Sequence, residues 1–240
     1  MKPVKVEYFS NVDQYKDWYM LHNAGKGTDC IVYLHGHGSH GDQFFIREDF
    51  EERRAFVKQN NLSVISPNLR DNAWMGPAAA EDLYQILKEN KQKYQWRRLL
   101  FMTGSMGATG ALIFAVLHPE LVDGLGLLGA ATDIGSYREY CLNQHTYPIH
   151  KEIADAITAN YPEESDYEKH SARKHAEKLT MPIRFYHGID DPVMPVSEMY
   201  ELQALLKNHP DAQFHAVPGE HDGPVPFFRE ALAGLLGKQI

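Results

Sequence analysis

The chain has 240 residues, of which 43% are apolar and 23% charged, and its formal net charge is −8. These values predict one domain with an ordinary core, and the acidic balance argues against a nucleic-acid partner, whose binding surface would be rich in Lys and Arg. With two cysteines, no apolar run long enough to span a membrane and no secretory signal at the start, a cytoplasmic protein without a disulfide framework or membrane contact is expected.

Short apolar runs typical of strands alternate along the chain with segments that have helical spacing. In chain order, we expect strands at residues 4–9, 18–22 and 30–35, a helix at 47–60, a strand at 62–66, a helix at 78–92, a strand at 99–103, a helix at 108–117, strands at 121–128 and 183–187, a helix at 196–207, a strand at 214–217 and a helix at 227–236. Strands that alternate with helices predict an α/β fold, with a mostly parallel central sheet of about eight strands flanked by helices.

One segment, residues 131–180, interrupts this alternation and is too long for a plain crossover between strands. It is expected to form a small helical cap inserted in a single domain that spans residues 1–240. Helices are expected at 149–160 and 170–179, and the acidic run Glu163, Glu164 and Asp166 is expected in a solvated turn.

The segment LLFMTGSMGA, residues 99–108, indicates a strand that ends just before Ser105 and a helix that begins just after it. So sharp a turn crowds the backbone, and small residues are therefore needed two positions before and two positions after the serine. Gly107 meets this need, whereas Thr103 is β-branched. The free N–H groups of the new helix would stabilise a developing oxyanion. Taken alone, Ser105 could equally be an ordinary helix N-cap.

The same segment resembles the nucleophile elbow G-x-S-x-G of the α/β-hydrolase superfamily, with Thr103 in place of the first glycine. Residues 186–195, YHGIDDPVMP, resemble the superfamily's acid loop H-G-x-x-D-x-x-x-P; this spacing selects Asp191, and Asp190 becomes a turn residue. His221, after the last expected strand, has the position of the superfamily's catalytic histidine. The resemblance implies a Ser-His-Asp triad in which His221 activates Ser105 and Asp191 orients His221.

The segment LHGHGSH, residues 34–40, resembles the superfamily's H-G-x-G turn. This resemblance implies an oxyanion hole formed by the backbone N–H groups of His37 and Met106. A metal site at His35, His37 and His40 is the rival interpretation, but no carboxylate accompanies these residues at helical spacing and a catalytic serine needs no metal. Neither a metal nor a cofactor is expected.

The substrate pocket is expected to involve His35, Gly36, Trp74 and Met75, since residues 68–75 follow a strand end on the catalytic edge. Core packing is an equal alternative for Trp74 and Met75. The insertion carries a mixture of aromatic and polar side chains that predicts a moderately polar substrate such as an aryl or sugar ester: Tyr137, Tyr140, His145, Tyr147, His150 and Tyr161.

Together, these motifs predict a small serine carboxylesterase-like hydrolase that cleaves esters of small or soluble molecules through an acyl-enzyme on Ser105. Three alternatives stay open: a peptidase of the prolyl-oligopeptidase type, an acyl-thioesterase, and a scaffold that binds a ligand without catalysis. The expected partner is a small-molecule ester. The sequence leaves the acyl and alcohol groups open, and also the oligomeric state, with a homodimer among the alternatives.

Overall fold

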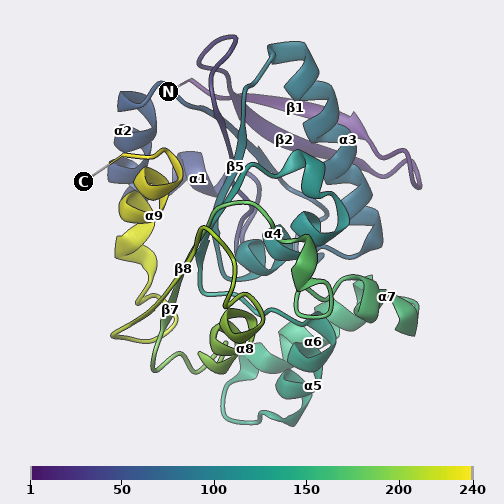
Figure 1. Ribbon diagram of the computed structural model, residues 1–240. Helices are drawn as coiled ribbons and strands as arrows, with labels where there is room; N and C mark the ends of the chain where they lie inside the picture. The colour runs from purple at the N-terminus through teal and green to yellow at the C-terminus, as the bar shows by residue number, and fades with distance from the viewer. Residues whose placement is uncertain (1, 239–240) are drawn as a thin grey trace.

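The computed structural model describes residues 2–238, whose strands form a single sheet in the order β1-β2-β4-β3-β5-β6-β7-β8 (Figure 1). The strands are β1 (Val4–Phe9), β2 (Lys16–His22), β3 (Cys30–Val32), β4 (Ser63–Pro67), β5 (Leu99–Gly104), β6 (Gly124–Leu128), β7 (Ile183–Gly188) and β8 (Ala212–Val217). Pairs β1–β2 and β2–β4 are antiparallel, and the pairs from β4 to β8 are parallel. The expected mostly parallel sheet with flanking helices is confirmed.

Helices cover both faces of the sheet (Figure 1). They are α1 (Gln43–Ile46), α2 (Glu51–Gln59), α3 (Pro77–Tyr94), α4 (Met106–Leu117), α5 (Ile134–Asn143), α6 (Pro148–Asn160), α7 (Glu164–Lys169), α8 (Ser197–Leu205) and α9 (Phe228–Leu235). Side chains of α1, α2 and α9 belong to the apolar cluster on one face, whereas those of α3, α4, α5, α6 and α8 belong to the larger cluster on the other. Among residues 2–238, no helix is both long and apolar enough to cross a membrane.

Strand β5, which leads to Ser105, lies near the centre of the sheet and is covered on both faces. Its alternate side chains Leu99 and Phe101 join the larger cluster, and Leu100 and Met102 join the cluster under α9. A strand that is buried on both sides has a continuous apolar sequence, which explains why residues 99–102, LLFM, include no polar residue. The end of β5 is therefore held from both faces.

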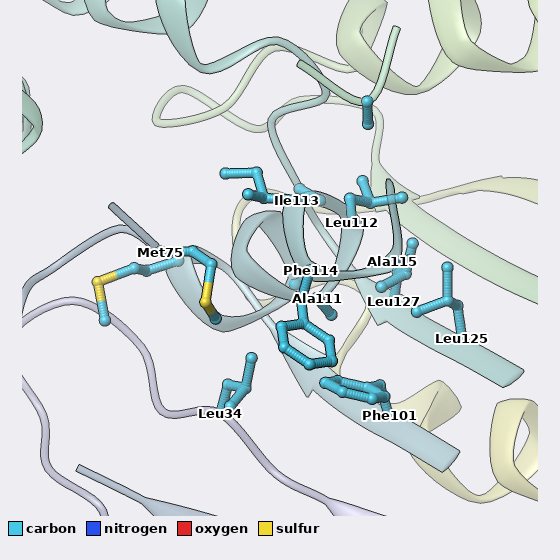
Figure 2. Packing of buried hydrophobic residues seen from close by; sticks show 14 of the residues in the cluster. Leu34, Met75, Phe101, Ala111, Leu112, Ile113, Phe114, Ala115, Leu125 and Leu127 are labelled. Carbon is cyan, nitrogen blue, oxygen red and sulfur yellow. The ribbon is translucent and has the colours of Figure 1, made fainter. Parts of the chain in front are cut away.

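Helix α4, which follows Ser105, is buried along almost its whole length, from Met106 to Val116. Figure 2 shows its side chains between β5, β6 and the segment around Met75. The ring of Phe114 stacks on that of Phe101, with centroids 5.5 Å apart. Since a helix that is apolar all round requires cover on every side, α4 is a rigid support for the turn at its N-terminus.

Several expected elements differ in the structure. The strand expected at 30–35 ends at Val32, and the one expected at 121–128 begins only at Gly124, because Pro119 starts a 3₁₀ turn (Pro119–Leu121) before it. In the insertion, the helix expected at 149–160 is confirmed as α6.

The rest of the insertion was assigned wrongly. Helix α7 occupies the acidic run that was expected in a turn, and residues 170–179 are mostly turns that end in a 3₁₀ turn (Ala176–Lys178). The Ser171 hydroxyl donates to Asp133 Oδ2 at 2.6 Å and accepts from the Lys174 N–H at 3.2 Å. Such local side-chain hydrogen bonds compete with helix formation. Helix α5, which was not expected, is capped by Asp133 Oδ1, which accepts from the Ser136 N–H.

The packing of α4 gives a stability prediction. Phe114→Ala removes a fully buried ring and leaves a cavity, so it is expected to lower the free energy of unfolding by about 3–5 kcal/mol. Leu117→Ala, at the half-buried end of the same helix, should cost only about 1 kcal/mol. Urea unfolding of both variants measures the difference, and equal losses would show that α4 is not clamped as described.

Candidate active site

Ser105 lies between β5 and α4 in a backbone conformation that L-residues rarely adopt, with φ 57° and ψ −132°. Its N–H donates to the carbonyl groups of Leu128 and Gly129, at 3.2 and 2.9 Å, at the end of the neighbouring β6. The sheet therefore maintains the strained turn, which is the geometry expected of a nucleophile elbow.

Thr103 fits this turn although it departs from the glycine of the motif. It is 1% exposed, and its hydroxyl donates a hydrogen bond to the Leu34 carbonyl. The tight position is Gly107, where an added Cβ would overlap both the Leu34 carbonyl oxygen and Thr103 Oγ1. The absence of a side chain at Gly107 thus makes room for the hydroxyl of Thr103.

The three residues of the expected triad come together at the C-terminal edge of the sheet. His221 Nε2 lies 2.9 Å from Ser105 Oγ, and His221 Nδ1 lies 2.8 Å from Asp191 Oδ2. Since an ionised carboxylate only accepts, the consistent arrangement has His221 Nδ1 donating to Asp191 and the Ser105 hydroxyl donating to Nε2. This leaves Nε2 as the acceptor for the serine proton.

Asp191 is a buried carboxylate with several donors around it. Its Oδ1 accepts from the N–H groups of Val193 and Met194 at 2.8 and 2.9 Å, and His187 Nε2 lies 3.5 Å from Oδ2. Burial alone would raise the pKa of Asp191, but the hydrogen bonds from His187, His221 and the Met194 N–H hold that pKa well below its usual range. Asp190, the alternative in the sequence, is exposed.

The pKa of His221 is set by two opposing effects. Burial disfavours the imidazolium and lowers the pKa, whereas the hydrogen bond to Asp191 and its negative charge raise it. The second effect is larger, so the pKa of His221 lies above its ordinary value of 6.5. The imidazolium formed when His221 takes a proton is thereby stabilised.

The two backbone N–H groups expected in the oxyanion hole, those of His37 and Met106, have no acceptor among residues 2–238. Met106 begins α4, so its N–H is one of the unpaired donors of the first helical turn. His37 lies in the turn that follows β3, and it lines the same cavity as Ser105. Both amides therefore retain a free donor beside the cavity that Ser105 lines.

A cavity of about 350 Å³ opens beside Ser105, lined by the side chains of the candidate triad's serine and histidine and by Gly36 and His37. His35, Trp74 and Met75 do not line it, which corrects the expected pocket. His35 is buried and lies between the carbonyl oxygens of Gly36 and Asn68, at 2.9 and 2.8 Å. It stabilises the turn without facing this cavity.

Trp74 and Met75 line a separate small pocket against Leu34 and Met106. The Trp74 indole N–H donates to His37 Nδ1 at 3.2 Å, and the Tyr161 hydroxyl donates to the Trp74 carbonyl at 2.9 Å. Trp74 is 1% exposed and is therefore a packing residue that positions His37. The alternative of core packing accounts for both residues.

The aromatic side chains of the insertion are also absent from the Ser105 cavity. Tyr137, His150 and Tyr161 are buried in packing contacts, and Tyr147 is exposed. Sequence reasoning missed four side chains that line the cavity, Tyr33, Gln43, Arg47 and Arg53. Tyr33 is expected only in a strand, Arg47 and Arg53 only in a helix, and Gln43 lies outside the expected elements. The position of Gln43, Arg47 and Arg53 after the H-G-x-G turn was the available signal.

Within residues 2–238, no group of three or more His, Cys, Asp or Glu side chains is arranged to hold a metal ion. His40 pairs with Asp71 at the surface, 3.1 Å away, whereas His35 and His37 make the contacts described above. Cys30 and Cys141 are both free and buried.

Comparison with known proteins bears on the fold. No family model matches the chain. The Escherichia coli (strain K12) protein named Esterase YjfP is 25% identical in an alignment that covers 85% of this chain and 89% of that protein. Among solved structures, the Staphylococcus aureus fluorophosphonate-binding serine hydrolase FphF is 14% identical with a TM-score of 0.74, covering 98% of both chains.

A second solved structure, the Pyrococcus furiosus esterase PF2001, has a TM-score of 0.73 at 15% identity and covers 98% of this chain and 90% of its own. The chain thus has the α/β-hydrolase fold that its motifs indicate.

The elbow geometry yields a prediction. Gly107→Ala should stabilise an unconstrained helix, but here the new Cβ meets the Leu34 backbone, so we expect a loss of about 2 kcal/mol or more in unfolding free energy. Gly110→Ala in the same helix is the matched control, because its Cβ would meet chiefly the flexible end of Met75. If thermal unfolding shows Gly107→Ala to be as stable as the control, the described turn is incorrect.

Proposed function

We propose that the protein is a serine hydrolase that cleaves carboxylic esters of small molecules, with Ser105 as nucleophile, His221 as general base and Asp191 as the residue that orients His221. The observation that carries this proposal is the continuous hydrogen-bonded chain from Ser105 through His221 to Asp191, at 2.9 and 2.8 Å, on a strained strand-to-helix turn. Two free backbone donors beside Ser105 add to it.

In the proposed reaction, Ser105 Oγ attacks the ester carbonyl carbon while His221 Nε2 takes the hydroxyl proton. The carbonyl oxygen becomes an oxyanion that accepts from the His37 and Met106 N–H groups. Collapse of this intermediate breaks the bond to the alcohol, which leaves with the proton from His221. Water, activated by His221, then releases the acid from Ser105.

One finding favours an ester over the alternatives. The curated relative is named an esterase, as is one of the solved structures with the same fold. A peptidase and an acyl-thioesterase use the same chemistry, so they differ from the proposal in their substrates.

Labelling with a fluorophosphonate probe tests the nucleophile. The wild-type chain should be labelled covalently, and Ser105→Ala should not, because no activated hydroxyl remains to attack phosphorus. Ser165→Ala, which removes an exposed hydroxyl on α7, should be labelled as fast as the wild type. Labelling can be followed by intact-protein mass spectrometry.

Absence of label on the folded wild type would contradict the catalytic proposal and favour a ligand-binding scaffold. A panel of p-nitrophenyl esters, acyl-thioesters and aminoacyl-nitroanilides then compares the substrate classes by kcat/KM. Faster turnover of the thioesters or anilides than of the esters would overturn the ester assignment while the nucleophile stands.

The pKa of His221 predicts the pH dependence. The neutral imidazole is the base, so kcat/KM should rise with pH through the raised pKa of His221, that is, with an inflection above 6.5. Asp191→Asn removes the negative charge that raises this pKa, so the inflection should move to lower pH and kcat should fall by about 10⁴-fold. Asp190→Asn, at the exposed neighbour, is the control and should keep the wild-type profile; an unchanged profile in Asp191→Asn would contradict the assignment.

A further inference from the structure

The cavity beside Ser105 contains polar side chains that the proposed mechanism does not use. They belong to the segment from α1 to α2, which follows the turn of His37. Arg53 and Gln43 are two of them, and both are largely buried. Their partners in the protein indicate what they are able to bind.

Arg53 is 8% exposed, and its guanidinium lies 4.0 Å from the ring centroid of Phe50 and 5.0 Å from that of Phe228. Its one hydrogen bond to another described residue is a long one, 3.4 Å from Nη2 to the Val225 carbonyl. Among residues 2–238, no carboxylate lies within ion-pair distance of Arg53. Most of its five N–H donors are therefore unused.

Such an arginine is costly for the protein unless something binds to it. Burial lowers the pKa of Arg53, which shows how far the guanidinium is removed from water, although an arginine stays charged at neutral pH. The contacts with Phe50 and Phe228 restrict its orientation while its edge borders the cavity. A buried charge without a partner costs stability unless an anion compensates it.

Gln43 adds donors of defined orientation. Its Oε1 accepts from the Tyr33 hydroxyl at 2.9 Å and from the Gly36 N–H at 3.3 Å. Because a backbone N–H only donates, the oxygen must be the atom on that side, and Nε2 is directed away from it. Nε2 has no acceptor among the described residues, and the side chain lines the cavity.

The other charged groups that line the cavity compensate Arg53 only partly, because Asp49 and Asp222 favour its charged form from a distance and neither forms an ion pair with it. Arg47 forms a bidentate pair with Asp49, with N–O distances of 2.9 and 2.6 Å, so these two charges largely cancel. Asp222 is exposed and next to His221, and it forms no ion pair with Arg53. The buried part of the cavity therefore has a net positive charge and unused N–H donors.

From this arrangement we propose that Arg53 and Gln43 form a subsite for an anionic group of the substrate, a carboxylate or a phosphate, next to the ester that Ser105 attacks. A planar guanidinium and a neighbouring amide N–H₂ match the acceptor oxygens of either anion. The inference rests on the proposed function for the position of the ester, and it specifies the class of substrate: an ester of a dicarboxylic acid or of a phosphorylated molecule.

Matched substrates test the subsite. Mono-p-nitrophenyl esters of succinate, glutarate and adipate carry a free carboxylate at increasing distance, and their methyl esters are the neutral counterparts. The wild type should favour at least one acid over its neutral counterpart by about tenfold or more in kcat/KM. Arg53→Met keeps the apolar stem and removes the charge, so it should abolish most of this preference.

Two further variants control for folding and for charge. Arg53→Lys keeps a positive charge without the planar fork, so it should retain part of the preference even if Arg53→Met unfolds. Lys58→Met removes an exposed charge from the same helix and should leave the ratio of the two kcat/KM values unchanged. A wild type that hydrolyses the neutral esters without preferring any acid would overturn the subsite, while the proposed function would stand.

Calorimetric titration of Ser105→Ala with glutarate and with inorganic phosphate gives a reading that needs no turnover. Binding that is lost in the double variant Ser105→Ala, Arg53→Met supports the subsite. The anion that binds more tightly shows whether the substrate group is a carboxylate or a phosphate. If neither anion binds, the subsite is refuted even when the esters are hydrolysed. If anions bind but the wild type hydrolyses no ester and takes no fluorophosphonate, the proposed function fails and the subsite stands.

Discussion

The strained backbone at Ser105 requires support from the sheet, and much of the surrounding architecture supplies it. The Ser105 N–H is held by the carbonyl groups at the end of β6, and the hydroxyl of Thr103 is held by the carbonyl of Leu34 after β3. Two neighbouring strands thus fix the turn from either side of β5. This fixed turn places Oγ within hydrogen-bond distance of His221, and it leaves the first N–H of α4 unpaired beside it.

The cavity beside Ser105 joins two parts of the chain that differ in character. The loops after β7 and β8 supply Asp191 and His221, whose hydrogen bonds define the chemistry proposed for the site. The segment from α1 to α2 supplies Gln43 and Arg53, which define the charge of its wall. Gln43 also accepts from the Gly36 N–H, next to His37, so the wall and the expected oxyanion turn share one hydrogen-bond network.

The sequence predicted the sheet, the elbow and the three residues now found in contact, because strand periodicity and short motifs are local signals. It did not predict which side chains line the cavity. Trp74 and Met75 follow a strand end, as pocket residues would, yet they line a separate small pocket, and Trp74 donates to His37. Which side they face depends on the path of the chain after β4, and no local pattern reveals that path. Likewise, Arg53 lies in a helix whose spacing reads as amphipathic, and its position between Phe50 and Phe228 depends on α9, which is distant in sequence.

The burial of α4 on all sides has an evolutionary consequence. A helix with almost no surface has few positions at which substitutions are tolerated freely, so the location of Ser105, the proposed nucleophile, is insulated from sequence drift. New substrate preferences must then arise elsewhere, in segments such as α1 to α2, which line the cavity beside Ser105. The molecule is divided into a part that resists change and a part that is free to diversify.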